Sequence, residues 1–481
     1  MYDVIIIGAG VIGCAVAREM SRYSDRVLIL EKNEDVCTGT TKANSAIIHS
    51  GYDAKNGTLK AKFNVKGNRM MDRIAYELDV PFERIGSLTV YTEEEQLVKL
   101  KELYQRGMNN GVEGLRILSR AETEALEPNI SDKVKGALYA PTAGIICPFK
   151  LCYAYAENAC ENGARFLMNQ KVGNIFRSED GLWHIATETD EFVAQAVVNA
   201  AGVYSDELNN LVSSRKIRIT PRRGDYLLLD RAAKGHVRHT VFQMPTALGK
   251  GVLVTPTVHG NTIIGPTAVD MIDKENTATT AEALSEILSK SSDSIKDLPT
   301  RQVITSFAGI RAVEDQHDFI LGEAEGASSF FNCAGIQSPG LSAAPAIGEY
   351  TAGLIREKLS LSEKENFNPY RKDILDPSAL SLEERNELIR ENPAYGRIVC
   401  RCESISEGEI IDAIRRTPGA VSLDGVKRRV RAGMGRCQGG FCSPKVMEIL
   451  ARERGCALEE VNKSSEGSYI VRGRTKDGEN G

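Results

Sequence analysis

The chain opens with a pattern of apolar runs and glycines that predicts alternating strands and helices. Residues 3–7 are mostly β-branched, which is typical of a buried parallel strand, and the glycine-rich stretch 8–13 follows at once. A helix is predicted to start within that stretch. Residues 26–30 and 196–198 have the same buried-strand character. This order of elements predicts a doubly wound α/β fold for the N-terminal part of the chain.

Three glycines behind the first strand predict a dinucleotide site. Gly8 permits the tight turn, Gly10 lets the backbone approach a pyrophosphate, and Gly13 allows the helix to pack closely on the strand. The second strand ends at Glu31, 18 residues after Gly13, where an acidic side chain binds a ribose hydroxyl. The helix N-terminus adds N–H groups and partial positive charge for the phosphates. This fingerprint alone does not distinguish NAD from FAD.

Two further stretches of small residues favour a flavin. Residues 38–51 carry hydroxyl, amide and small side chains directly after the predicted ribose-binding acid, which suits a backbone lying along a flavin diphosphate and ring. The strand 196–198 runs into Asn199-Ala200-Ala201-Gly202, where small side chains again permit a ligand to come close. The chemistry predicted for the N-terminal part is therefore that of a flavoprotein.

Four of the eleven cysteines form two close pairs near the C-terminus, Cys400 with Cys402 and Cys437 with Cys442, separated by 34 residues. Two irons bridged by sulfide need four thiolates, and close pairs on loops supply them in twos. Structural zinc is the competing interpretation, although zinc sites usually draw on C-x₂₋₄-C pairs, and four unligated thiols are a third. The spacing favours a 2Fe-2S cluster.

The residues around these cysteines predict a small helical unit. Ser406 and Glu409 form a capping box that opens a helix through Arg415, and residues 417–419 end it. The basic run 427–431 is predicted to lie on a helix that faces solvent, a partner or the negatively charged cluster, rather than nucleic acid.

Length and charge narrow the class of protein. The 481 residues predict two or three domains, and the net charge of −5 gives no overall attraction to nucleic acid or to an anionic membrane. The longest apolar stretch, 4–17, is interrupted by glycines and is shorter than the ~20 residues of a membrane-spanning helix. It also lacks the basic start of a signal peptide. A cytoplasmic protein is expected, with peripheral contact to a membrane left open.

Six segments that occur in family order carry a resemblance to the D-amino-acid-oxidase superfamily of FAD enzymes. The branch is the one with L-2-hydroxyglutarate oxidases and type II glycerol-3-phosphate oxidases, and the resemblance covers residues 1 to about 360. The segments are 43–51, 221–226, 249–252, 265–268, 307–311 and 338–347. Residues 431–442 resemble the 2Fe-2S domain of the bacterioferritin-associated ferredoxin type.

The resemblance implies roles for individual residues. His49 is the candidate general base for a secondary alcohol, since imidazole accepts protons near neutral pH, with a purely structural histidine as the alternative. Arg311 and Lys250, each in a glycine-flanked apolar segment, are the candidate anion-binding residues. The implied FAD contacts are Gly8, Gly10, Gly13, Glu31, Thr40, Thr41, Asn44, Ser45, Val172, Ala201, Gly202, Gly309, Ser338, Gly340, Leu341 and Ser342. Cys147, where many relatives have an aspartate before proline, is expected to be a packing residue.

The combined prediction is an α/β protein with a doubly wound FAD-binding domain, a β-rich substrate-capping domain and a small helical iron–sulfur domain. FAD-binding segments are expected at about 1–80, 145–210 and 300–360, and capping segments at about 81–144 and 211–299. A charged linker at 361–394, the cluster domain at 395–455 and a polar tail at 456–481 complete the chain.

The expected reaction is oxidation of sn-glycerol 3-phosphate to dihydroxyacetone phosphate, since the Gly-Lys-Gly segment 249–251 and the segment 338–341 resemble the glycerol-3-phosphate branch more closely. Electrons are expected to leave through the cluster to a flavoprotein or a quinone, and a hetero-oligomer is left open. An L-2-hydroxyglutarate or related 2-hydroxyacid dehydrogenase is the alternative enzyme. An electron-transfer subunit without its own substrate is the alternative from another class.

Overall fold

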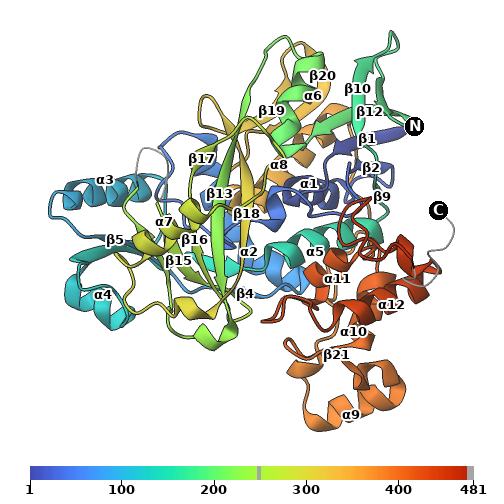
Figure 1. Ribbon diagram of the computed structural model, residues 1–481. Coiled ribbons are helices and arrows are strands. Elements are labelled where there is room, and N and C mark those ends of the chain that lie inside the picture. The colour runs from blue at the N-terminus through green and yellow to red at the C-terminus, as the bar shows by residue number, and fades with distance from the viewer. Residues whose placement is uncertain (246–250, 474–481) are drawn as a thin grey trace.

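The computed structural model describes residues 1–245 and 251–473, and it contains two large sheets and a small helical unit (Figure 1). No helix among these residues is long and apolar enough to cross a membrane.

The first large sheet has eight strands, and its centre is parallel. β1 pairs in parallel with β2 and β12, β2 with β9, and β12 with β20. The remaining three strands pair antiparallel at one side. The strands are β1 (Tyr2–Ile7), β2 (Val27–Leu30), β9 (Arg165–Leu167), β10 (Val172–Arg177), β11 (Trp183–Thr187), β12 (Glu191–Asn199), β19 (Ile320–Ala324) and β20 (Ala327–Ala334). The parallel centre confirms the doubly wound α/β class predicted from the apolar runs.

Helices pack closely around this sheet because glycines stand at their contacts. They are α1 (Val11–Met20), α2 (Leu59–Leu78), α5 (Pro148–Glu161), α6 (Ser205–Val212) and α8 (Gly340–Leu359). A Cβ on Gly67 of α2 would lie 2.1 Å from the carbonyl oxygen of Ser342 on α8. A Cβ on Gly348 of α8 would lie 2.8 Å from the carbonyl oxygen of Ala15 on α1. The three helices therefore approach backbone to backbone, and their apolar faces share one core with β1 and β2.

The second large sheet has nine strands and forms the other half of the molecule in Figure 1. Its strands are β5 (Ser87–Tyr91), β6 (Arg116–Ser119), β7 (Gly136–Ala140), β13 (Ile219–Leu229), β14 (Thr240–Gln243), β15 (Leu253–Pro256), β16 (Thr262–Gly265), β17 (Val269–Asp270) and β18 (Val303–Glu314). The helices α3 (Gln96–Asn109), α4 (Arg120–Leu126) and α7 (Ala281–Ser291) accompany it. β18 pairs with β13 along its whole length, so residues 303–314, expected in the FAD-binding part, belong to this second sheet.

A three-stranded sheet sets the position of residue 49. β3 (Ile47–Ile48) and β4 (Phe82–Glu83) both pair antiparallel with β8 (Gly144–Ile146). Ile146 continues the contact, since its N–H donates to the carbonyl oxygen of Ala46 at 3.0 Å. Cys147 follows β8 as a buried residue before α5, in agreement with a packing role.

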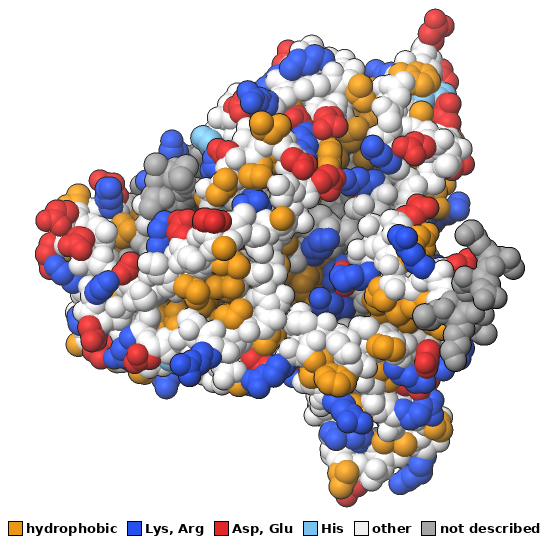
Figure 2. Space-filling view, viewed as in Figure 1, with side chains coloured by type: hydrophobic (Ala, Val, Ile, Leu, Met, Phe, Trp, Pro, Cys, Tyr) orange, Lys and Arg blue, Asp and Glu red, His pale blue; other side chains and the backbone are white. Residues whose placement is uncertain are grey.

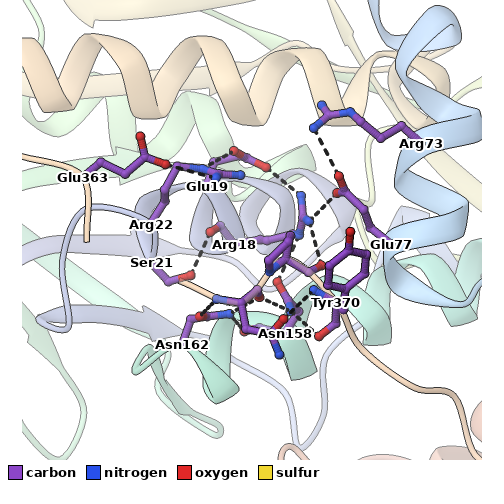
Figure 3. A network of polar contacts seen from close by, with 12 residues as sticks. Arg18, Glu19, Ser21, Arg22, Arg73, Glu77, Asn158, Asn162, Glu363 and Tyr370 are labelled. Atoms are coloured by element: carbon purple, nitrogen blue, oxygen red, sulfur yellow. Dashed lines mark hydrogen bonds and ion pairs between the residues drawn. The ribbon is translucent and has the colours of Figure 1, made fainter. Parts of the chain in front are cut away.

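The stretch after α8, expected to be a linker, is instead fastened to three helices. Arg18 on α1 is fully buried, and its guanidinium binds Glu77 of α2 at 2.7 Å, Asn158 of α5 at 3.1 Å and the carbonyl oxygen of Pro369 at 3.1 Å (Figure 3). Asn158 donates in turn to the carbonyl oxygen of Asn368 at 3.0 Å. A buried guanidinium needs such partners, so residues 368–371 complete the polar interior of the first domain. The helix predicted near 381–390 is α9 (Leu382–Glu391).

The C-terminal unit has its own apolar core. It contains β21 (Ile398–Cys400), β22 (Ile405–Ser406), α10 (Glu407–Arg415), α11 (Leu423–Val430) and α12 (Ser443–Arg454). The predicted capping box is present, since the Ser406 hydroxyl accepts from the Glu409 N–H and the Glu409 carboxylate accepts from the Ser406 N–H.

The basic run was expected to face solvent, a partner or the cluster, but two of its arginines face the first domain instead. Arg428 and Arg429 on α11 are 5% and 3% exposed and lie against the first domain. Arg429 forms a bidentate pair with Asp35 at 2.6 and 2.8 Å, and its guanidinium lies 3.9 Å from the centre of the Tyr153 ring. Arg428 donates to the Tyr153 hydroxyl at 2.9 Å and to Asp35 at 3.3 Å. These side chains fix the C-terminal unit on the first domain.

Candidate active site

A cavity of 1370 Å³ runs from the end of β1 to the face of the second large sheet. It is large enough for a dinucleotide together with a small substrate, given that drug-sized ligand pockets span ~300–1,000 Å³. Its lining has twice as many Lys and Arg as Asp and Glu side chains. The cavity therefore favours anionic ligands.

At the β1 end the glycines have the geometry predicted for a pyrophosphate site. Gly8 has a φ of +103°, and a Cβ there would lie 2.5 Å from the carbonyl oxygen of Ala200. A Cβ on Gly13 would lie 1.9 Å from the carbonyl oxygen of Gly8, so only glycine lets α1 pack on this turn. Gly10 precedes α1 without a side-chain cap and lines the cavity. The turn and the helix start thus form a cradle that fits a diphosphate.

Glu31 lies at the end of β2 and lines the same part of the cavity. Its carboxylate accepts hydrogen bonds from the N–H groups of Ala9 at 2.8 Å and Asn33 at 3.0 Å. Burial raises the pKa of this carboxyl, while both hydrogen bonds lower it. The acid therefore braces the glycine turn where it lines the cavity.

The loop that follows is pressed against β18, which joins the dinucleotide end of the cavity to the second sheet. A Cβ on Gly309 would lie 1.9 Å from the carbonyl oxygen of Ala43, and the Thr40 hydroxyl donates to the carbonyl oxygen of Ile310 at 2.5 Å. Thr41 accepts from the Val11 N–H at 3.0 Å. This loop thus contacts both the start of α1 and the strand that carries Arg311.

His49 stands directly after β3 with its backbone held on both sides. Its N–H donates to the Ser342 hydroxyl at 2.7 Å, and its carbonyl oxygen accepts from Asn68 at 3.0 Å. The ring nitrogen Nε2 lies 3.3 Å from the Ser338 hydroxyl, and the ring centre lies 5.7 Å from that of Phe242. His49 is half-buried and lines the cavity, so its imidazole can meet a ligand.

Arg311 lies on β18 and lines the same cavity. It is linked to a buried carboxylate, that of Asp225, through Thr267. Its Nη2 donates to the carbonyl oxygen of Thr267 at 2.6 Å, while its Nε is buried without a hydrogen-bond partner among the described residues. The Thr267 hydroxyl donates at 2.7 Å to Asp225, which is fully buried. A Cβ on Gly224 would lie 2.7 Å from Arg311 Nη2, so this glycine leaves room for the guanidinium.

Burial lowers the pKa of Arg311, but a guanidinium keeps its charge near neutral pH. A buried charge with an unused donor is costly unless a ligand completes its hydrogen bonds. Arg311 therefore has a donor available for a ligand in the cavity.

Two aromatic residues in the cavity were not singled out from the sequence. Tyr226 lies opposite Phe307 across the β13–β18 pair, and the two rings stack with centres 4.9 Å apart. Burial raises the pKa of the Tyr226 hydroxyl. Phe242 comes from β14. In the sequence, only the alternation of side chains along these strands could have indicated that Tyr226 and Phe242 share the cavity. Alternation alone does not tell which face of a strand meets the cavity.

Most residues expected to contact FAD line this one cavity. They are Gly8, Gly10, Glu31, Thr40, Thr41, Asn44, Ser45, Val172, Ala201, Gly202, Gly309, Ser338, Gly340 and Leu341. Gly13 and Ser342 are not among the residues that line the cavity. Gly13 allows α1 to pack on the glycine turn, and Ser342 accepts a hydrogen bond from the His49 N–H. Lys250 lies outside the described residues, and its neighbour Gly251 lines the cavity.

The four C-terminal cysteines gather in the cluster unit as two thiol pairs. Cys402 Sγ and Cys437 Sγ lie 3.6 Å apart, and Cys400 and Cys442 are hydrogen-bonded to each other. The hydrogen bond from the Phe441 N–H lowers the pKa of the Cys437 thiol. The pKa of the Cys400 thiol is lowered chiefly by its hydrogen bond with Cys442 and further by the N–H groups of Gly433 and Glu403. Such N–H groups suit sulfur ligands of an iron–sulfur cluster.

The thiols are arranged as two pairs. In the described ranges, 1–245 and 251–473, no group of three or more His, Cys, Asp and Glu side chains is placed to hold a single metal ion. Two separate thiol pairs fit two irons better than one tetrahedral zinc.

Comparisons with known proteins agree with both parts of the structure. Residues 3–354 match the family described as FAD dependent oxidoreductase, and residues 398–452 match the BFD-like 2Fe-2S binding domain. A glycerol 3-phosphate dehydrogenase of Caloramator mitchellensis is 53% identical, with 99% of each chain covered. A mitochondrial L-2-hydroxyglutarate dehydrogenase of Bos taurus is 32% identical over 57% of this chain and 62% of its own.

A solved structure shares the first part of the fold. The dithionite-reduced L-alpha-glycerophosphate oxidase of Mycoplasma pneumoniae with FAD bound superposes with a TM-score of 0.73 at 34% identity, covering 77% of this chain and 98% of that one. The predicted FAD and 2Fe-2S cofactors are thereby confirmed. The chain belongs to the family of FAD-dependent oxidoreductases and carries a C-terminal 2Fe-2S binding domain.

Proposed function

We propose that the protein oxidises the C2 hydroxyl of sn-glycerol 3-phosphate to the ketone of dihydroxyacetone phosphate. The observation that carries this proposal is Arg311, a half-buried arginine whose Nε is buried without a hydrogen-bond partner among the described residues, in the same cavity as His49. A phosphate would complete the hydrogen bonds of Arg311 in a planar, two-point contact. The 53% identical glycerol 3-phosphate dehydrogenase of Caloramator mitchellensis supports the same substrate.

The chain's own residues supply binding and proton transfer. Arg311 binds the anionic end and so fixes the distance of the secondary alcohol from the base. His49 removes the hydroxyl proton, and the Ser338 hydroxyl at 3.3 Å holds the imidazole in place. Bound FAD supplies the hydride acceptor. Phe242, whose ring centre lies 5.7 Å from that of His49, and Tyr226 add aromatic surface to the lining of the same cavity.

An L-2-hydroxyacid is the second candidate, because Arg311 could bind a carboxylate with the same fork. The similarity to the L-2-hydroxyglutarate dehydrogenase of Bos taurus supports it. The surplus of Lys and Arg in the lining suits a dianion of either kind. Anaerobic reduction of the flavin by one substrate and not by the other separates the two proposals.

The attached cluster favours a dehydrogenase over an oxidase, because direct reaction of flavin with oxygen needs no iron. We propose that electrons leave one at a time through the 2Fe-2S cluster to a partner protein or a quinone. Firm attachment of the cluster unit through Arg428, Arg429 and Asp35 supports this proposal, since the rate of electron transfer falls steeply with distance and a docked unit keeps that distance constant.

Replacing Cys437 by serine should separate flavin reduction from electron exit. The variant loses one thiolate of the cluster, while His49 and Arg311 are untouched, so the substrate should still bleach the flavin at the parent rate. Reoxidation by the physiological acceptor should fall by at least about tenfold. Stopped-flow absorbance follows the flavin and the cluster separately.

Cys456→Ser is the matched control, because this half-buried thiol lies in the same unit but outside the two pairs. It should keep the iron content and the rates of the parent. If Cys437→Ser turned over with the acceptor at the parent rate, the cluster would have a structural role and the proposed electron exit would be wrong.

A further inference from the structure

One edge of the cysteine cluster faces solvent. Cys400 and Cys442 are 1% and 2% exposed, whereas Cys402 is exposed and Cys437 is half-buried. The inner pair therefore belongs to the core of the unit, and the outer pair lies at its surface. Any protein that takes electrons from the cluster would approach most closely at Cys402 and Cys437.

An aromatic ring stands out beside this edge. Phe441 lies in the loop between Cys437 and Cys442 and is 88% exposed. The loop is held in place, since Gln438 N–H donates to the carbonyl oxygen of Gly435 at 2.9 Å and Gly440 N–H to that of Cys437 at 3.0 Å. The backbone thus presents the ring outward from a fixed turn, and exposed aromatic rings of this kind are enriched at protein interfaces.

The same edge is positively charged. Arg401 lies exposed between two cysteines, and within the part of the chain that the structure describes it has no hydrogen-bond or ion-pair partner. Arg436 and Lys445, also within three residues of a cysteine, pair with Asp230 and Glu448. Glu403, the acid nearest in sequence to Cys402, is 7% exposed and paired with Arg231 and Arg431. Figure 2 shows Lys and Arg side chains on the lower part of the molecule, where Figure 1 places α9, and at its junction with the upper part, with hydrophobic and some acidic side chains among them.

We infer that the edge formed by Arg401, Cys402 and Phe441 is the electron-exit surface, and that it docks an acidic electron-carrier protein. The inference rests on the proposed function and names the class of its acceptor. Arg401 would pair with a carboxylate of the carrier, and the Phe441 ring would enter an apolar hollow next to the carrier's redox group. Each encounter reduces the carrier by one electron and oxidises the enzyme by one, so two encounters remove the electrons of one substrate oxidation.

A membrane surface is the less favoured partner. Stable attachment to anionic lipid takes clusters of ~4–8 basic residues or an amphipathic helix with several large apolar side chains. The exit edge offers one ring and three cations, of which two are already paired. A small complementary protein surface matches this size better.

The inference predicts weaker binding after a change at either end of the edge. The probe is an acidic flavodoxin with a fluorescent label, and its anisotropy is measured with the oxidised holoenzyme at several salt concentrations. Phe441→Ala should weaken binding by about tenfold or more, and Arg401→Glu should do so most strongly at low salt. Phe176→Ala and Arg215→Glu are the controls, since both side chains are exposed and lie outside the cluster unit.

Reoxidation by flavodoxin of enzyme reduced with dithionite provides the kinetic readout, and an unchanged EPR spectrum shows that the cluster is intact. Parent-like binding and reoxidation by both variants would overturn the inference. The inference would also be overturned if the parent enzyme sedimented with phosphatidylserine vesicles and Arg401→Glu did not, because the edge would then face a membrane. Because dithionite replaces the substrate, failure of glycerol 3-phosphate to bleach the flavin would contradict the proposed function alone.

Discussion

His49→Ala should slow reduction of the flavin by substrate by a factor of about 10² to 10⁴, the usual contribution of a positioned base. The histidine lines the cavity with Arg311, and its backbone is held by Ser342 and Asn68 rather than by its ring. Removal of the imidazole should therefore leave the loop in place. Single-turnover mixing with glycerol 3-phosphate under anaerobic conditions measures this rate directly.

The cluster should be unaffected in this variant, so its visible and EPR spectra serve as the internal control. His184→Ala is the matched control, since His184 on β11 pairs with Glu191 and is not among the residues that line the cavity, so the variant should be reduced at the parent rate. Reduction of His49→Ala at the parent rate would assign this histidine a structural role.

Asp35→Ala should loosen the cluster unit from the flavin domain and destabilise the protein by about 3–5 kcal/mol, the cost of removing one partner from a buried ion pair. Asp35 is 1% exposed and accepts from both Arg428 and Arg429, so its loss leaves two buried guanidinium groups without their carboxylate. Urea unfolding, followed by flavin fluorescence, measures the change.

The same variant should also slow electron transfer between the two centres, because their separation is no longer fixed. Asp132→Ala is the matched control, since Asp132 pairs with Arg120 at 3.4 Å while its side chain is 89% exposed, and surface pairs contribute at most about 1 kcal/mol. Equal stability of Asp35→Ala and Asp132→Ala would show that the contact between the two units does not depend on this carboxylate.

The sequence predicted those features that local spacing determines. Gly8 and Gly13 are close together in the sequence. Gly8 has a positive φ, and a side chain at either position would collide with a backbone carbonyl group, so both positions require glycine. The two cysteine pairs and the capping box at Ser406 are equally local. Local chemistry of this kind can be interpreted without knowing what lies across the fold.

The features that the sequence did not predict all depend on contacts between distant segments. The basic run at 427–431 looks like a solvated helix face until Asp35 and Tyr153, almost 400 and 300 residues away, are placed beside it. Arg311 was expected to bind an anion, but its support by Thr267 and Asp225 follows only from the pairing of β13 with β18. A charged sequence therefore does not by itself indicate an exposed surface.

We propose that this flavoprotein oxidises glycerol 3-phosphate and passes the electrons to its own cluster. The most direct measurement is an anaerobic titration of the purified holoenzyme with sn-glycerol 3-phosphate and, separately, with L-2-hydroxyglutarate, recording flavin absorbance and the EPR signal of the reduced cluster. We predict that glycerol 3-phosphate bleaches the flavin and produces the cluster signal, while L-2-hydroxyglutarate leaves both centres oxidised. Bleaching by L-2-hydroxyglutarate with no response to glycerol 3-phosphate would contradict the account.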